Sequence, residues 1–211
     1  MTILALEFSS ARRSVALANG AGVVLAEAVE ETGGRGTGAI GLIERVLSAA
    51  KLEREAVELV AVGLGPGSYT GIRAAIAVAQ GWQLARGLKL LGISSMESLA
   101  AQAQAERVFG RVNLVVDAQR GEFYLAVLDI SSTKRQELEP LRIVTPATVT
   151  ARQTAGEICA GPEMSCLLFP TAAMVAVLAA NRSDFVTGEK LEPIYLRATG
   201  FVKAPAGRLI H

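Results

Sequence analysis

A glycine-rich segment at residues 63–73, GLGPGSYTGIR, holds the residues whose types and spacing could do chemistry. It joins a β-branched run at residues 57–62 to a helical pattern of apolar and small residues at about 72–86. Glycine permits positive φ and proline lacks an N–H donor, so the chain must turn sharply here, and Ser68 or Thr70 can cap the following helix. The positions that shape this signature loop are Gly65, Pro66, Gly67, Ser68, Thr70 and Gly71.

A loop of this kind can bind phosphate, because free N–H groups and the helix dipole at a helix N-terminus attract an anion. The segment is not a Walker A sequence, however, since it lacks the Lys-Ser/Thr pair that reaches the terminal phosphates and magnesium, and it does not match G-x-G-x-x-G. A phosphate-binding loop and a purely structural turn both remain open, and the missing lysine favours the turn.

Composition excludes several classes of protein. The 211 residues are 51% hydrophobic, with a mean hydropathy of +0.37 and a net charge of +1, which predicts a substantial core and no stand-alone nucleic-acid surface. No apolar run reaches the roughly 18 residues of a membrane span, so we expect a cytoplasmic protein without membrane contact. The single histidine is His211, and Cys159 and Cys166 have no second pair, so we expect no catalytic residue and no metal site.

Apolar periodicity predicts two α/β halves without a flexible linker between them. In the first half, strands are expected at residues 3–8, 13–18, 23–29, 57–62 and 88–93, and helices at 39–50, 72–86 and 94–104. In the second, strands are expected at 113–116, 122–129, 138–144 and 158–161, and helices at 148–157 and 170–181. Three antiparallel strands followed by β-α units describe a two-lobed, actin-like (ASKHA) α/β fold with ribonuclease-H-like lobes, mixed sheets and flanking helices. We place the first lobe at residues 1–104 and a smaller second lobe at 105–211, and leave open whether the final segment returns to the first.

Glu7 and Asp117 end the first strand of each half, in the sequences EFS and DAQ. Actin-type ATPases have a glycine beside such an acid, so that the backbone can approach phosphate. Because these glycines are absent, we expect Glu7 to accept hydrogen bonds from a neighbouring turn rather than bind a metal. Asp117, Arg120 and Glu122 could join Glu7 in a polar cluster between the lobes, where a structural ion pair is favoured over a catalytic one.

Four segments resemble the signatures of one family. GPGSYTGIR, at residues 65–73, resembles the GPGSFTGxR signature of the bacterial TsaB (YeaZ) proteins, which belong to the machinery that places threonylcarbamoyl on adenosine 37 of tRNA. ILALEFSS (3–10), DAQRGEFY (117–124) and PIYLR (193–197) are similar to the family's opening strand, its DARxGEVY segment and its PVYLR ending. Four motifs in the right order are more specific than any one of them.

The resemblance implies a catalytically inert subunit that binds and activates TsaD, the relative that carries a His-x-x-x-His metal motif and the transferase chemistry, alongside the ATPase TsaE. It implies no intrinsic cofactor, with ATP or ADP and a metal on the partner subunits, contact with tRNAs reading ANN codons only through the complex, and a homodimer when alone. The sequence departs from the family at Glu7, where relatives usually have Asp, and at residues 33–41, where GGRGTGAIG replaces a His-Ser or His-Thr pair.

Two other functions remain open. One is a nucleotide-binding ATPase or kinase-like enzyme of the same fold, which would need the absent glycine-containing phosphate motifs. The other is a glycoprotease, which the lack of suitable histidines disfavours.

The helix expected at residues 72–86 is apolar around most of its circumference, so it is either enclosed in its own domain or packed against a second polypeptide. With the resemblance, this pattern predicts a face of the first-lobe helices that self-associates and binds the partner. The residues expected there are Ile40, Ile43, Leu47, Tyr69, Ile72, Arg73, Ala75, Ala79 and Trp82. The helix dipole disfavours a cation in the first turn, so we expect Arg73 to neutralise a carboxylate of this chain or of the partner.

Overall fold

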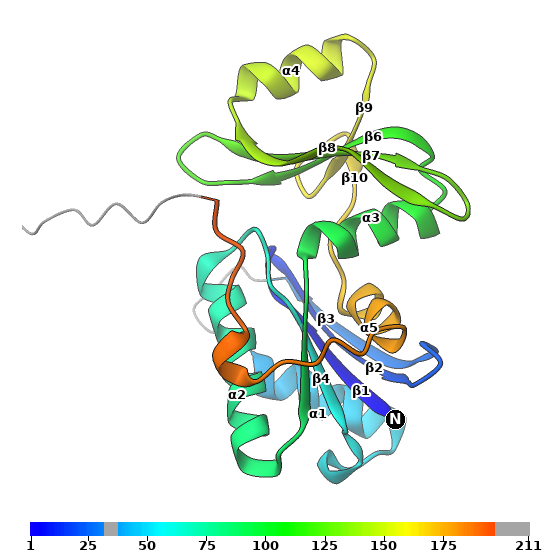
Figure 1. Cartoon of the computed structure of the whole chain (residues 1–211), viewed down its shortest axis with the longest axis vertical. Helices are drawn as coiled ribbons and strands as arrows, with labels where there is room; N and C mark the ends of the chain where they lie inside the picture. Colours follow the sequence, from blue (N-terminus) through cyan, green and yellow to red (C-terminus); the bar gives the residue numbers. More distant parts are fainter. Residues whose placement is uncertain (32–37, 197–211) are drawn as a thin grey trace, which may run out of the picture.

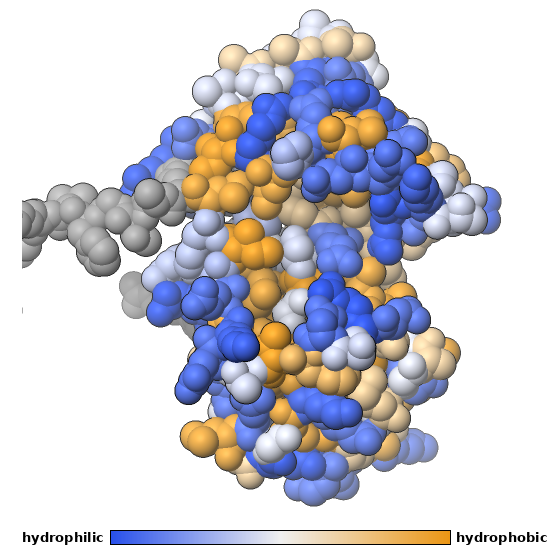
Figure 2. Space-filling model, in the orientation of Figure 1, coloured by the Kyte–Doolittle hydropathy of each residue, from blue (hydrophilic) through white to orange (hydrophobic). Residues whose placement is uncertain are grey.

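The computed structural model describes residues 1–31 and 38–196. Figure 1 shows two lobes, one above the other, each built around a five-stranded sheet with helices on both faces. Figure 2, in the same view, shows the waist between the lobes and the hydrophobic residues that each lobe exposes on this side.

The sheet of the first lobe has the order β3-β2-β1-β4-β5. Its strands are β1 (Thr2–Glu7), β2 (Arg12–Asn19), β3 (Val24–Glu31), β4 (Leu59–Gly63) and β5 (Lys89–Ile93). The first three strands form an antiparallel meander, and β4 and β5 run parallel to β1. Both faces are covered, which explains the nearly continuous apolar runs in β1 and β4. Leu4 and Leu6 pack beneath α1 (Ala39–Ala50) and α2 (Tyr69–Arg86), whereas Ile3 and Ala5 pack against α5 (Ala172–Ala180) on the opposite face.

The second lobe repeats this topology, with the strand order β8-β7-β6-β9-β10. Its strands are β6 (Gly110–Asp117), β7 (Phe123–Ile130), β8 (Arg135–Val144), β9 (Ile158–Gly161) and β10 (Cys166–Leu167). Helix α3 (Ser95–Ala105) packs on one face, and α4 (Pro146–Thr154) packs on the other through Val149. Two sheets with the same order confirm the two-lobed, actin-like fold predicted from the sequence.

After β10 the chain returns to the first lobe. Val175 and Ala179 of α5 are completely buried against the first sheet. The segment that follows runs along the edge of this sheet, where Val186 pairs with Leu90, and the short 3-10 helix η2 (Gly188–Lys190) contacts α2. A second 3-10 turn, η1 (Arg54–Ala56), lies between α1 and β4.

Five residues expected at an intermolecular interface belong instead to the lobe's own core. Ile72, Ala75 and Ala79 have no exposed surface, and Ile43 and Leu47 are nearly as buried, because the apolar face of the first sheet needs α1 and α2 as its cover. Their side chains cannot contact a partner, which corrects the expectation from the sequence.

The other four expected positions reach the surface. Ile40 and Tyr69 are 53% and 57% exposed, Arg73 is exposed, and Trp82 is half-buried.

The inward and outward sides of α2 can be distinguished by one substitution on each. Ala75→Arg would bury a charge without a partner and should lower the free energy of unfolding by about 3–5 kcal/mol. Ala77→Arg, on the exposed side of the same helix, should change it by no more than about 0.5 kcal/mol. Urea denaturation followed by circular dichroism measures both. Equal denaturation midpoints would contradict the orientation of α2 described here.

Candidate functional site

The signature loop connects β4 to α2. Gly65 and Gly67 have φ of 85° and 147°, and the Gly65–Pro66 peptide is cis. Ser68 caps α2, because its side chain accepts a hydrogen bond from the N–H of Gly71 at 3.3 Å. Of the two capping residues expected from the sequence, the structure uses Ser68.

The loop lies directly against the residues that follow β1. The N–H of Ser68 donates to the carbonyl oxygen of Ser9 at 2.7 Å. A Cβ atom at Gly67 would lie 2.1 Å from this same oxygen, and one at Gly71 would lie 2.0 Å from the carbonyl oxygen of Phe8. Backbone cannot yield cheaply at such distances, so only glycine allows this close approach.

Two glycines of α2 test this packing. Gly71→Ala should lower the free energy of unfolding by about 1–3 kcal/mol, because the methyl group overlaps the backbone of Phe8. Gly81→Ala meets no neighbouring atom within 4 Å and should raise it by about 0.5–1 kcal/mol through helix propensity. Thermal and urea denaturation give both values. A Gly71→Ala protein as stable as the wild type would rule out the contact between α2 and Phe8.

Glu7 is the buried carboxylate beneath the loop. Its Oε1 accepts a hydrogen bond from the N–H of Ser9 and its Oε2 accepts one from the Oγ of Ser95, both at 2.8 Å. The Oγ of Ser95 in turn accepts a bond from the N–H of Gly65 at 3.0 Å. Burial raises the pKa of Glu7 above its ordinary value of 4.5, and the hydrogen bonds from Ser9 and Ser95 oppose this rise. These contacts match the hydrogen-bonding role expected of Glu7 from the sequence.

The raised pKa of Glu7 predicts how stability depends on pH. Above 4.5 the folded protein binds more protons at Glu7 than the unfolded chain does, so this residue's contribution to the free energy of unfolding falls as the pH rises through the raised pKa. Glu7→Gln lacks this titration. The free energy of unfolding of the wild type minus that of Glu7→Gln should therefore decrease with rising pH in this window and then become constant. Urea denaturation of both proteins between about pH 4 and pH 8 measures the difference. A difference that does not vary with pH would show that Glu7 keeps its ordinary pKa.

The polar cluster expected between the lobes is divided into two groups. Glu7 takes its hydrogen bonds from Ser9 and Ser95, whereas Asp117 accepts bonds from the backbone N–H of Gln119, at 2.8 Å, and from its side-chain amide. The other two expected residues, Arg120 and Glu122, lie in the turn between β6 and β7.

A cleft of about 650 Å³ separates the lobes beside the signature loop. Its walls are the turn after β1, the loop and the start of α2, the end of β6, and the segments on either side of β10. The residues that line it are Ser9, Ser10, Ala11, Gly67, Ser68, Tyr69, Thr70, Val116, Asp117, Gln119, Pro162, Glu163 and Phe169. The charged side chains among them are Asp117 and Glu163, and the guanidinium of Arg12 lies beside the cleft, 5.4 Å from the centre of the Phe169 ring.

Arg73 and Tyr195 both contact Tyr69, a residue that lines this cleft. Its Nη1 donates to the hydroxyl of Tyr69 at 3.0 Å, and its guanidinium lies 5.1 Å from the centre of the Tyr69 ring. The ring of Tyr195 stacks on that of Tyr69, with centroids 5.4 Å apart and planes inclined by 22°. Within this chain the hydroxyl and ring of Tyr69 thus take the place of the carboxylate expected beside Arg73. A carboxylate of the partner remains a prediction.

Tyr195 brings a second sequence motif to the loop. The N–H of Ile194 donates to the carbonyl oxygen of Leu64 at 2.9 Å, which holds residues 193–196 against the end of β4. Arg197, the last residue of PIYLR, lies outside the described residues. Both motifs could be identified in the sequence, but nothing in their spacing indicates that they meet.

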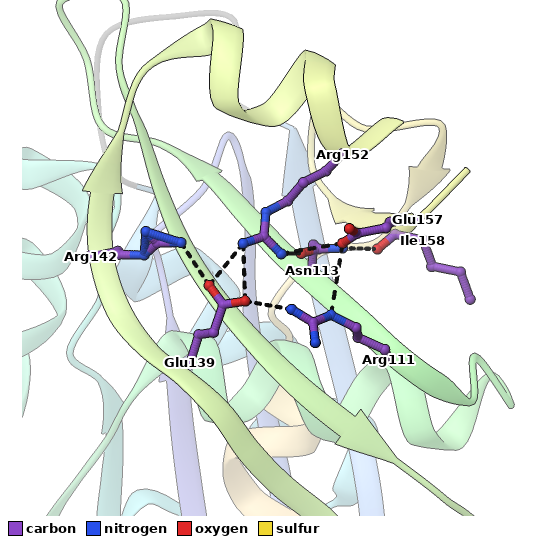
Figure 3. Close-up of polar contacts among 7 residues, drawn as sticks. All are labelled: Arg111, Asn113, Glu139, Arg142, Arg152, Glu157 and Ile158. Carbon is purple, nitrogen blue, oxygen red and sulfur yellow. Dashed lines mark hydrogen bonds and ion pairs between the residues drawn. The ribbon is translucent and has the colours of Figure 1, made fainter. Parts of the chain in front are cut away.

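A charged network that the sequence did not predict fixes α4 to the second sheet (Figure 3). Glu139 of β8 lies at its centre and accepts hydrogen bonds from Arg111 at 2.5 Å, from Arg142 at 2.7 Å, and from Arg152 of α4 at 2.8 and 3.0 Å. The hydrogen bonds from Arg152 lower the pKa of Glu139. Because Val149 is the buried residue of α4, this network supplies much of the contact between helix and sheet, and its role is structural.

Other kinds of site are not formed by the described residues. In residues 1–31 and 38–196, no group of three or more His, Cys, Asp or Glu side chains could hold a metal ion. Cys159 and Cys166 are free thiols whose pKa values are raised by burial. Within the same ranges, no helix is both long enough and apolar enough to cross a membrane.

Two lobes of one topology, with a cleft between them, define this chain as a member of the actin-like class. A family model described as TsaD, tRNA N6-adenosine threonylcarbamoyltransferase, matches residues 38–190.

Within the actin-like class, the chain is similar to particular curated relatives and solved structures. The chain is 33% identical over 85 residues, 40% of its length, to the tRNA threonylcarbamoyladenosine biosynthesis protein TsaB of Escherichia coli (strain K12). It is 31% identical over 131 residues, 60% of its length, to the protein of the same name from Haemophilus influenzae. The aligned part spans 37% and 53% of these two relatives.

The structure of a Pseudomonas aeruginosa protein described as similar to peptidase YEAZ matches with a TM-score of 0.78 at 25% identity, and covers 93% of this chain and 99% of that one. YeaZ from the same organism matches with a TM-score of 0.77 at 24% identity, and covers 92% of this chain and 100% of that one. The chain belongs to the family that the TsaD model describes and, within it, to the TsaB/YeaZ family, which confirms the resemblance in the sequence.

Proposed function

We propose that this protein is a non-catalytic scaffold subunit in the synthesis of threonylcarbamoyladenosine at position 37 of tRNAs that read ANN codons. It pairs with a TsaD homologue, alongside a TsaE homologue, in the cytoplasm, and forms a homodimer when alone. The observation that carries the proposal is the signature loop, where the family's fold is kept but the N–H groups of Gly65, Ser68 and Gly71 are bonded to the protein's own oxygens. Nucleotide, metal and tRNA are accordingly handled by the partner subunits.

Each of the two rival functions is weakened by one observation. An ATPase or kinase of this fold needs donors for phosphate in the cleft, and three N–H groups of the loop are already bonded within the protein. A metal-dependent glycoprotease needs a cluster of ligands, and residues 1–31 and 38–196 form none.

Reconstitution tests the proposed function. The protein, mixed with TsaD and TsaE homologues from the same organism, should form a complex with the TsaD homologue on size exclusion and should be required for threonylcarbamoylation of tRNA. ATP turnover by the isolated protein should be at background. Modification at full rate without this protein, or ATP hydrolysis by it alone, would contradict the proposal.

The surface that fits a partner is the exposed stripe of α2, which we call the α2 face: Tyr69, Arg73, Ala77, Gly81 and Leu84. The first four residues are spaced four apart and so lie along one side of the helix, and Leu84, one turn further, is 90% exposed. Exposed tyrosine and arginine are enriched at the centres of interfaces. The stack of Tyr195 on Tyr69 and the bond from Arg73 hold these side chains in place, so they lose little entropy on binding.

Arg73 is the residue of this face that a partner carboxylate would pair with. Its guanidinium carries five N–H donors on an exposed side chain, and those not bonded to Tyr69 and Tyr195 can reach a carboxylate. Arg73→Ala should weaken binding to the TsaD homologue by about 10- to 100-fold in calorimetric titration, as expected at an interface hot spot. It should change the melting temperature of the isolated protein little, because the contact with Tyr69 is exposed.

Lys134→Ala is the matched control for Arg73→Ala. Lys134 is exposed on the turn between β7 and β8 in the second lobe, so its loss removes a positive charge away from the α2 face. This variant should bind the TsaD homologue like the wild type. Equal affinities for the wild type and Arg73→Ala would exclude Arg73 from the partner interface.

A further inference from the structure

We infer that Glu7 is a positioning residue, which holds the signature loop in the shape that presents Tyr69 and Arg73 to the partner. This inference rests on the proposed function: Glu7 would fix the loop from which the α2 face starts. Glu7 contacts neither of the two presented side chains in the interactions described above. It acts through two hydrogen-bonded branches, one to each end of the loop.

The first branch fixes the beginning of the loop through α3. The Oε2 of Glu7 accepts the hydroxyl of Ser95 at 2.8 Å, and this oriented hydroxyl accepts the N–H of Gly65 at 3.0 Å. The N–H of Ser95 donates to the carbonyl oxygen of Gly65 at 2.8 Å. Both polar groups of Gly65 are therefore held by one serine, and the carboxylate of Glu7 decides which way the hydroxyl of that serine points.

The second branch fixes the end of the loop through the turn after β1. The Oε1 of Glu7 accepts the N–H of Ser9 at 2.8 Å, and the carbonyl oxygen of Ser9 accepts the N–H of Ser68 at 2.7 Å. Ser68 is the cap of α2, and Tyr69 is the first residue of the helix. The two peptide groups of Ser9 therefore fix the position of Ser68, and with it the position of Tyr69 at the start of the α2 face.

The carboxylate of Glu7 is tightly surrounded by neighbouring atoms. A Cβ atom at Gly63 would lie 2.0 Å from its Oε2, and Glu7 and Ser95 are 0% and 1% exposed. Water cannot replace Glu7 as the acceptor for Ser9 and Ser95 in such a space. A change at Glu7 must therefore be transmitted to the loop.

Ser95→Ala, Glu7→Gln and the control Ser98→Ala test this inference. Ser98 is also a buried serine of α3, but its hydroxyl exchanges hydrogen bonds with the backbone of Thr171 and does not contact the loop. Hydrogen exchange followed by mass spectrometry measures the loop, and calorimetric titration with the TsaD homologue measures its effect on binding. Ser95→Ala and Glu7→Gln should each speed exchange over residues 64–72 and weaken binding about tenfold, the value of one well-formed hydrogen bond.

Ser98→Ala should be destabilised to a similar extent as Ser95→Ala, yet keep wild-type exchange in the loop and wild-type affinity. In the double variant Glu7→Gln, Ser95→Ala the loss of affinity should be smaller than the product of the two single losses, because both changes break the same branch. Multiplicative losses would show that the two residues act independently, and would overturn the first branch.

Unchanged exchange over residues 64–72 in both single variants would overturn the inference. Faster exchange with unchanged affinity, or an equal loss of affinity in Ser98→Ala, would overturn the role of the loop in presenting Tyr69 and Arg73. If the wild type does not bind the TsaD homologue, the proposed function fails. The exchange pattern would then still decide whether Glu7 anchors the loop.

Discussion

The burial of one carboxylate, that of Glu7, is the constraint on which the arrangement of the site depends. A charge removed from water must be compensated by hydrogen bonds, and Glu7 receives them from the N–H of Ser9 and the hydroxyl of Ser95. These donors belong to the turn after β1 and to α3, the helix that leads into the second lobe. One interaction therefore ties the first strand, the signature loop and the connection between lobes into one unit.

The two lobes share a topology but are stabilised differently. Both faces of the first sheet are covered by apolar helix surfaces, from α1 and α2 on one side and α5 on the other. The second sheet has an apolar cover from α3, but α4 contributes Val149 and is otherwise held by Arg152 on Glu139. Apolar burial in the first lobe gives α2 a fixed position, whereas α4 of the second lobe is held in part by charged contacts that are partly open to solvent.

Periodicity in the sequence was sufficient for the fold, but not for the orientation of α2. A helix with Ala74, Ala75, Val78 and Ala79 around its circumference has no clear polar side, so sequence alone cannot tell which residues face inward. The strand β10, with two residues, is too short to show alternation. The stack of Tyr195 on Tyr69 was missed for a different reason, since residues 193–196 reach the start of α2 only because the chain returns to the first lobe after the second is complete.

The hydrogen bonds of the glycine-rich loop favour the structural one of its two interpretations. A phosphate would need the N–H groups that line the turn and the start of α2. The N–H of Gly65 is bonded to Ser95, that of Ser68 to Ser9, and that of Gly71 to the side chain of Ser68. The protein's own oxygens thus occupy three of the donors that a phosphate would otherwise use. The same bonds hold the loop in one shape, and a fixed loop at the start of α2 keeps Tyr69 and Arg73 in place at the surface.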